Sequence, residues 1–171
     1  MTLRCQYGLT QPVHEANEQD VDDAVAAAKS AFPAWRDLGP KERGTYLHKL
    51  ADLIRESMKD LAYLESISTG RPVSQYFDAA AAADNLSYFA EAGWTIQGTS
   101  SLHTPGHLNL TVKQPYGVVG CIIPWNIPVL AFVLKVAPAV AAGNTVVLKS
   151  SEKAPLTVSF AMVQGPLLEL C

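Results

Sequence analysis

The feature that most constrains the fold of this 171-residue chain is a pair of apolar runs joined by a helical segment within residues 115–157. In order, these are the run Val118–Ile123, the loop 124–128, a helix over Val129–Ala142, a stop at Gly143-Asn144, and the run Thr145–Leu148, which ends at Lys149. Strand, loop, helix, glycine stop and strand is the order of a βαβ unit. Because the strands of a buried parallel sheet are near-continuous apolar runs, this stretch predicts the start of a parallel α/β sheet.

Polar residues follow both predicted strands at the point where each strand ends. Asn126 comes shortly after the first strand, and Lys149, Ser151 and Glu152 close or follow the second. Open α/β sheets bind their ligands at the carboxyl ends of their strands. The sequence therefore predicts that a ligand site lies where these side chains meet.

The residues before this stretch have the periodicity of helices. We expect a first helix capped by Asn17 and ended by Pro33, a second beginning at Gly39-Pro40, a third over Leu61–Ser68 capped by Asp60 and stopped by Gly70, and a fourth over Val73–Ala92 opened by Pro72. We divide the chain into a helical part (1–97), a connector and strand (98–113) and the start of the sheet (114–171), all within one domain. The alternation of apolar and polar residues over Leu108–Lys113 predicts a half-exposed strand. A last helix is expected from Pro155, interrupted at Gly165-Pro166.

Charge and composition exclude several classes of partner. The net charge is −3 without blocks of like charge, so neither nucleic acid nor an anionic membrane is an expected partner. Gly117–Leu134 is uncharged and long enough for a membrane span, but Pro124, Asn126 and Pro128 at its middle favour strand, loop and helix instead. Three scattered cysteines form no disulfide framework or metal spacing, which predicts a reducing, cytoplasmic setting.

The stretch that carries the predicted site closely resembles the aldehyde dehydrogenase superfamily. The matching segments are Gln114–Gly120, Ile122–Pro128, Ala137–Ala139, Ala142–Val147, Lys149 and Ser151–Thr157. Many matches in one register are far more specific than a lone glycine motif. The resemblance implies an α/β fold in which a helical layer precedes the first βαβ unit of a Rossmann-like NAD-binding domain, present here in incomplete form.

The resemblance also implies the NAD(P)-dependent oxidation of an aldehyde to a carboxylic acid. In this family the residue matching Asn126 donates its side-chain amide to the developing oxyanion, and the residues matching Lys149 and Glu152 hold the adenosine ribose. Contacts from Ile123, Pro124, Trp125 and Ser151 to the cofactor are implied in the same way. An acidic group at the end of the second strand favours NAD over NADP, because it repels a 2′-phosphate.

Local interpretations of the same residues remain open. Asn126 also suits an Asx-turn before Pro128, and Lys149 with Glu152 also suits a surface ion pair capping the next helix. The family's nucleophilic cysteine and base glutamate lie in a later domain and have no counterpart in this sequence. We do not assign that role to Cys121, which lies mid-strand, or to the terminal Cys5 and Cys171.

We therefore expect a truncated form of such an enzyme and keep two functions open. The first is an aldehyde dehydrogenase, and the second is an inactive remnant or interaction subunit that pairs with a full-length paralogue. In either case the incomplete sheet leaves strand edges exposed, so we expect a homo-oligomer or association with that paralogue.

Overall fold

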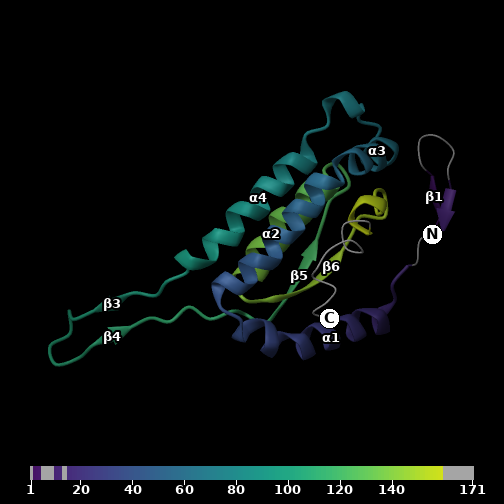
Figure 1. Cartoon of the computed structure of the whole chain (residues 1–171). Helices are drawn as coiled ribbons and strands as arrows, with labels where there is room; N and C mark the ends of the chain where they lie inside the picture. The colour runs from purple at the N-terminus through teal and green to yellow at the C-terminus, as the bar shows by residue number, and fades with distance from the viewer. Residues whose placement is uncertain (1, 5–9, 13–14, 160–171) are drawn as a thin grey trace.

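The computed structural model describes residues 2–4, 10–12 and 15–159 of the chain (Figure 1). Its helices are α1 (Glu18–Asp37), α2 (Pro40–Glu56), α3 (Met58–Thr69), α4 (Asp78–Ala92) and α5 (Pro128–Ala141), with 3-10 turns η1 (Val73–Gln75) and η2 (Gly93–Thr95). Its strands are β1 (Thr2–Arg4), β2 (Thr10–Pro12), β3 (Ser100–Ser101), β4 (Asn109–Leu110), β5 (Val118–Ile122) and β6 (Thr145–Lys149). The predicted mixture of helices and a parallel sheet is confirmed.

The predicted βαβ unit is formed by β5, α5 and β6. The two strands pair in parallel from Val118 opposite Thr145 to Ile122 opposite Lys149. Gly143 lies between α5 and β6 with a φ of +88°, a backbone conformation that is strained for any residue with a side chain. The strands are less buried than predicted, since Ile122 and Lys149 are exposed and only Cys121 of β5 is fully buried. The reason is that each strand has a single neighbour in the described part of the chain, so the sheet is covered incompletely.

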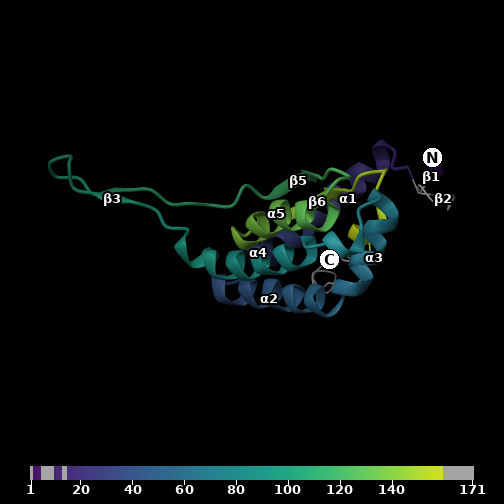
Figure 2. The ribbon, with the colours of Figure 1, turned by 90° about the horizontal axis from the view of Figure 1, so that it is seen from above.

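Two helices, α4 and α2, are stacked on the βαβ unit. Figure 2 shows α5 next to the strands, then α4, then α2, with α4 packed between the other two. Small residues permit this close approach: a Cβ added to Gly44 of α2 would lie 2.7 Å from the carbonyl oxygen of Ala90 in α4. The core between the layers is built from Leu47, Leu50, Leu86, Val129, Phe132 and Val133, none more than 1% exposed. Burial of this apolar surface is what holds the helical layer to the sheet.

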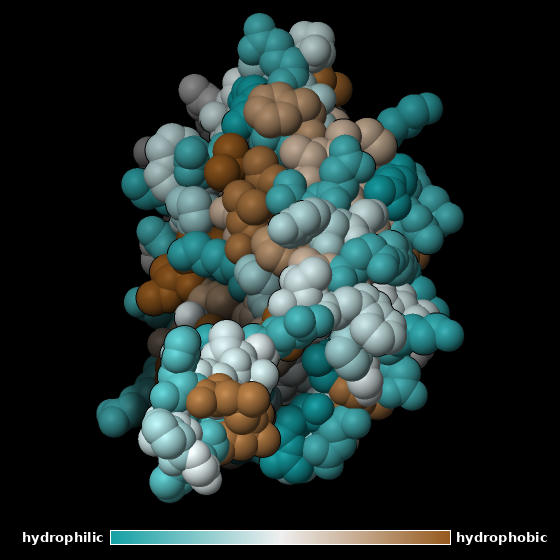
Figure 3. Space-filling model, turned by 90° about the vertical axis from the view of Figure 1, so that its left-hand side faces the viewer, coloured by the Kyte–Doolittle hydropathy of each residue, from teal (hydrophilic) through white to brown (hydrophobic). Residues whose placement is uncertain are grey.

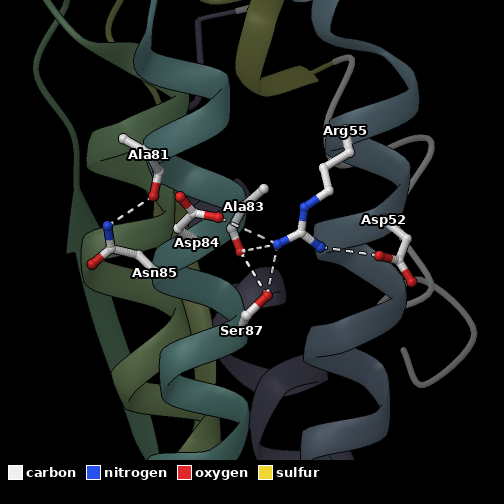
Figure 4. Close-up of polar contacts among 7 residues, drawn as sticks. All are labelled: Asp52, Arg55, Ala81, Ala83, Asp84, Asn85 and Ser87. Carbon is white, nitrogen blue, oxygen red and sulfur yellow. Dashed lines mark hydrogen bonds and ion pairs between the residues drawn. The ribbon is translucent and has the colours of Figure 1, made fainter.

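A polar cluster joins α2 and α4 on the outside of the stack. The guanidinium of Arg55 donates to Ser87 Oγ at 2.9 Å and is paired with Asp52 at 3.0 Å, and it also reaches Ala83 and Asp84 at 3.4 Å (Figure 4). The Arg55 side chain remains 41% exposed. Since exposed ion pairs contribute little, this cluster fixes the register of two helices that are held together mainly by their apolar faces.

The first helix differs from the prediction at its carboxyl end. Asn17 caps α1 as predicted, because its side chain accepts from Gln19 N and Asp20 N while Asp20 bonds back to Asn17 N. The expected end at Pro33 is wrong, because α1 continues to Asp37. The extra turn buries Trp35 and lets its Nε1 donate to the carbonyl of Val140 at 3.0 Å, which offsets the backbone hydrogen bond that a proline lacks.

Two later helix boundaries also differ. The third helix begins at Met58 rather than Leu61, so Asp60 lies in its first turn instead of capping it; the predicted stop at Gly70 is confirmed. The fourth predicted helix is divided, because residues 73–75 form a 3-10 turn and α4 starts only at Asp78. Pro72 has an extended conformation directly before that turn, with a φ of −60° that lies in the range its ring imposes.

The predicted connector is a long hairpin that extends away from the body of the molecule (Figure 1). Thr99 and Thr111 close its base through Thr111 N to Thr99 O (2.9 Å), and Gly98 is required there because a Cβ would overlap the Thr111 carbonyl. The predicted half-buried alternation over residues 108–113 is wrong, since Leu108, Leu110 and Val112 are all exposed. Among the residues that the structure describes, no second layer covers either face of the hairpin. Figure 3, in which this hairpin points toward the viewer, shows hydrophobic patches on an otherwise largely hydrophilic face.

Two further expectations concern the rest of the chain. The stretch 117–134 is occupied by β5, a loop and the start of α5, and none of the helices described is long and apolar enough to cross a membrane. A helical turn follows Pro155 over residues 156–159. The predicted interruption at Gly165-Pro166, together with Cys5 and Cys171, lies outside the described residues.

Candidate functional site

The predicted site lies at the carboxyl ends of β5 and β6. Because these strands are parallel and Ile122 is opposite Lys149, the loops that follow them emerge at the same edge. The pairing continues one step beyond β5, where Ile123 N donates to Lys149 O at 3.1 Å. The two loops also touch, since the ammonium of Lys153 lies 5.8 Å from the centre of the Trp125 ring.

Asn126 lies in the loop between β5 and α5 and is exposed. Its side-chain amide makes no hydrogen bond to any residue described, so the Asx-turn that was the alternative interpretation is not formed. Its backbone carbonyl instead accepts a hydrogen bond from Arg71 Nη2 at 3.1 Å. The loop is thus anchored through its backbone, and the amide of the side chain remains available as a donor.

The polar residues after β6 form a local cluster. Lys149 Nζ lies 3.0 Å from Glu152 Oε2, with the two side chains 62% and 40% exposed. The Glu152 backbone N–H, and then the Lys149 ammonium, hold the pKa of the Glu152 carboxyl below its ordinary value. Ser151 is buried, and its Oγ accepts from Lys153 N at 3.2 Å, which fixes the turn. The local ion pair considered as the alternative interpretation is therefore present, and both of its charged groups still face solvent.

The remaining predicted site residues differ in accessibility. Pro124 and Trp125 are exposed at the edge, beside Asn126. The Ile123 side chain is 3% exposed and belongs to the hydrophobic core. Any ligand at this edge would therefore meet the backbone of Ile123, and the side chains of Pro124 and Trp125.

Beneath the Asn126 loop lies a buried acidic cluster that the sequence analysis missed. Glu65 and Asp78 are 2% and 0% exposed, and Arg71 is paired with Asp78. Glu65 Oε1 accepts from Val129 N at 2.9 Å, in the first turn of α5. Burial raises the pKa of Glu65 to about 7, opposed by the Val129 N–H and reinforced by the neighbouring Asp78. Burial likewise raises the pKa of Tyr76, whose side chain also lies near this cluster.

A sequence signal for Glu65 does exist. It follows Leu61 and Ala62 by four and three residues, so all three share one face of α3, and all three are buried. An acidic residue on the apolar face of a helix needs a partner in the interior. The partner here is the amino terminus of a helix that begins more than sixty residues later, which no local pattern identifies.

Cys121 is the one free cysteine within the described residues, and it is buried mid-strand as predicted. Burial raises the pKa of its thiol, with Lys135 acting in the opposite direction. A buried thiol with a raised pKa is a poor nucleophile. Cys121 is therefore a packing residue of the core.

The aldehyde dehydrogenase family model matches residues 8–164. An aldehyde dehydrogenase of Emericella nidulans is 46% identical over 153 residues, which cover 87% of this chain and 30% of that protein. The crystal structure of PnpE in complex with nicotinamide adenine dinucleotide superimposes with a TM-score of 0.91 at 40% identity, covering 99% of this chain and 35% of that one.

A third similar structure is an NADP-dependent enzyme from E. coli, with a TM-score of 0.89 and 32% identity over 96% of this chain and 36% of that one. The chain thus spans about a third of the length of the proteins it matches. The matched region takes in both strands of the parallel sheet, the helix between them and the layer of helices before them. This chain belongs to the aldehyde dehydrogenase family.

Proposed function

We propose that this chain supplies the cofactor-binding edge and an oxyanion donor for the NAD-dependent oxidation of an aldehyde to a carboxylic acid. The observation that carries the proposal is the placement of the Asn126 amide and the Lys149–Glu152 pair at one edge of the parallel sheet. The proposal is supported by the family to which the chain belongs.

The residues at this edge suit the adenosine ribose of NAD. The Glu152 carboxylate is solvent-accessible and ionised at neutral pH, so it accepts hydrogen bonds from ribose hydroxyls, while the Lys149 ammonium donates to them. A 2′-phosphate beside Glu152 would add like charge, and we therefore propose NAD rather than NADP. When bound, NAD accepts the hydride that leaves the aldehyde carbon. Trp125 and Pro124 line the same edge, together with the backbone of Ile123 and the Ser151 turn.

Asn126 is proposed as the oxyanion donor. It is an uncharged donor held between Pro124 and Pro128, and its backbone is fixed by Arg71. A donor that is oriented before the reaction stabilises developing negative charge without the cost of reorganisation. Its exposed amide, without a partner in the described part of the protein, is what such a role requires.

Cofactor preference gives a direct test of this edge. Binding of NAD⁺ and NADP⁺ to the chain is measured by isothermal titration calorimetry for the wild type, Glu152→Gln and the control Glu56→Gln, which removes an exposed acid from α2. We expect Glu152→Gln to weaken NAD⁺ binding about 10-fold and to narrow the preference for NAD⁺, because a charge-assisted hydrogen bond and a repulsion are both lost. Tighter binding of NADP⁺ by the wild type, or an equal effect of Glu56→Gln, would contradict the proposal.

The β3–β4 hairpin favours a second function, association with another chain. It holds several apolar side chains that no described part of the chain covers: Leu102, Leu108, Leu110 and Val112. We propose that the arm packs on a second copy or on a full-length relative, since exposed apolar patches of this kind mark interfaces. Sedimentation velocity is expected to show an oligomer that Leu110→Lys with Val112→Lys dissociates, while Val21→Lys on α1 leaves it intact. A monomeric wild type would contradict packing on a second copy, and failure to co-sediment with an added full-length relative would contradict the other pairing.

We also propose that segments 1–97, 98–113 and 114–171 act as one unit. The support is the continuous core, in which residues of α2 and α4 pack directly on α5. A single cooperative unfolding transition, identical by far-ultraviolet circular dichroism and by tryptophan fluorescence, is expected. Two separated transitions would argue against it.

A further inference from the structure

The loop that presents Asn126 is held at two points by one neighbouring segment. On one side of the loop, Arg71 Nη2 donates to the carbonyl of Asn126 at 3.1 Å. On the other side, Val129 N donates to Glu65 Oε1 at 2.9 Å. Glu65 belongs to α3, and Arg71 follows shortly after the end of that helix. The two side chains that hold the loop are therefore only six residues apart in the sequence.

The side chain of Arg71 is itself held by a buried carboxylate. Arg71 is paired through its other terminal nitrogen with Asp78, the first residue of α4, which is completely buried. Because a guanidinium is planar and presents its donors in a rigid fork, engaging Asp78 with one nitrogen directs the second toward Asn126. The carboxylate of Asp78 thus determines where the backbone of Asn126 is held.

The cluster is more polar than packing alone requires. The carboxyl groups of Glu65 and Asp78 are both buried, beside the phenol of Tyr76 and the guanidinium of Arg71. Buried polar atoms of this kind are destabilising, and an apolar set of the same volume would stabilise the fold better. Their retention beside an exposed loop needs an explanation other than stability.

We propose that Arg71 and Glu65 are positioning residues that hold the Pro124–Pro128 loop in the geometry in which Asn126 can act as a donor. The inference rests on the proposed function of Asn126. In this arrangement Arg71 holds the backbone of Asn126, and Glu65 holds the first turn of α5 at Val129. Neither side chain contacts the reacting groups, because both act through the backbone of the loop.

The test is residue-resolved nuclear magnetic resonance on the 171-residue chain, without cofactor or aldehyde, which follows backbone chemical shifts and amide hydrogen exchange. Arg71→Met is expected to shift the carbonyl resonance of Asn126 and the amide resonance of Ile127, because the peptide group that joins them loses its hydrogen-bond donor. Exchange in α5 between Val133 and Val140 is expected to change less than about 2-fold, because only the loop is affected. Such shifts confined to the loop would not accompany a general loss of stability shared by all of α5.

Conservative variants separate the positioning role from packing. Glu65→Gln keeps an acceptor for Val129 N, so the exchange rate of the Val129 amide is expected to stay as in wild type. Glu65→Met removes the acceptor, and this amide is expected to exchange about 10-fold faster. Arg71→Lys keeps the positive charge but lacks the planar guanidinium that binds two partners at once. We therefore expect shifts of the loop resonances intermediate between wild type and Arg71→Met, and this variant serves as the test if Arg71→Met fails to fold. The matched control is Arg55→Met, which removes another arginine that ties two elements together.

Three results would overturn the inference: wild-type resonances of Asn126 and Ile127 in Arg71→Lys, a uniform loss of exchange protection along the whole of α5, or the same shifts of the loop resonances in Arg55→Met. The result is separable from the proposed function, because no cofactor is used. A chain whose loop is held as described but which does not bind NAD⁺ would contradict the proposed function alone. Normal NAD⁺ binding with a loop indifferent to these variants would contradict the positioning role alone.

Discussion

The two ends of α5 are both closed by side chains from the helical layer, but in different ways. At the carboxyl end, Trp35 Nε1 donates to Val140 O and the guanidinium of Arg43 donates to Ala141 O at 3.1 Å. At the amino end, Glu65 accepts from Val129 N. A cation at the carboxyl end and an acid at the amino end both complement the helix dipole.

The difference between the ends is their charge state and what lies beyond them. Burial lowers the pKa of Arg43, yet a guanidinium stays protonated at any physiological pH. Burial raises the pKa of Glu65 to about 7, so its charge changes near neutrality. Beyond the carboxyl end, the chain turns at Gly143 beside Arg43 and enters β6, whereas beyond the amino end lies the exposed loop of Asn126. The contacts at the carboxyl end of α5 stabilise the fold. The amino end instead keeps buried polar groups that lower the stability, and it lies beside the candidate site.

The largest effect is expected from removing Arg43. Its guanidinium also donates to Leu38 O, so Arg43→Met leaves carbonyls unpaired at the ends of both α1 and α5. We expect the free energy of unfolding to fall by about 3–4 kcal/mol, as for buried polar groups that lose their partner. Urea unfolding followed by circular dichroism measures this. Arg36→Met, an exposed arginine of α1, is the control and should leave the midpoint unchanged.

A pH-dependent effect of similar size is expected at the other end of α5. Because the folded pKa of Glu65 is raised above its unfolded value of 4.5, its contribution is fully present below about pH 4.5 and is lost as the pH rises to about 7. The difference in unfolding free energy between wild type and Glu65→Gln should change by on the order of 3 kcal/mol over this interval. Glu56→Gln should show no such change. A difference that is constant between pH 4.5 and 7 would show that Glu65 titrates normally.

A smaller effect is expected from Trp35→Phe. The variant keeps an aromatic ring but loses the hydrogen bond to Val140 O and some buried volume, so a loss of about 1–2 kcal/mol is expected. Exchange at the carboxyl end of α5 should rise while the resonances of the Asn126 loop keep their wild-type positions. Opening of that loop in Trp35→Phe would show that the two ends are not independent.

The smallest effect on stability is expected at the exposed polar cluster between α2 and α4. Arg55→Met removes contacts to Ser87 and Asp52 in a side chain that is 41% exposed, and we expect a loss of about 0.5–1 kcal/mol. Thermal unfolding at low and high salt tests it, because the difference should shrink as ions screen the pair. A loss as large as that of Arg43→Met would contradict the contrast drawn between exposed and buried arginines.

Features that depend on neighbouring residues were predictable from the sequence. The alternation of apolar runs and turn residues predicts β5, α5 and β6 to within one residue at each boundary, and the Asn17 cap is a local signal. The family resemblance then selects Asn126, Lys149 and Glu152 as site residues, and those assignments stay predictions.

Features that depend on distant contacts were not predictable. The extension of α1 past Pro33 depends on Trp35 reaching a carbonyl 105 residues away. The support of the Asn126 loop depends on Arg71, 55 residues earlier in the chain. The exposure of both faces of the β3–β4 hairpin depends on the absence of a second layer among the residues described, while an alternating sequence normally indicates that one face is buried.

The most direct test of the account is a titration of the ¹⁵N-labelled chain with NAD⁺, followed by residue-resolved nuclear magnetic resonance. We predict shifts at Trp125, Asn126 and Lys149–Glu152, at the amino end of α5 and the adjoining strand edge, and none at Val140 or Arg43. Shifts confined to the carboxyl end, or a folded chain without shifts at saturating NAD⁺, would contradict the assignment of the cofactor-binding edge.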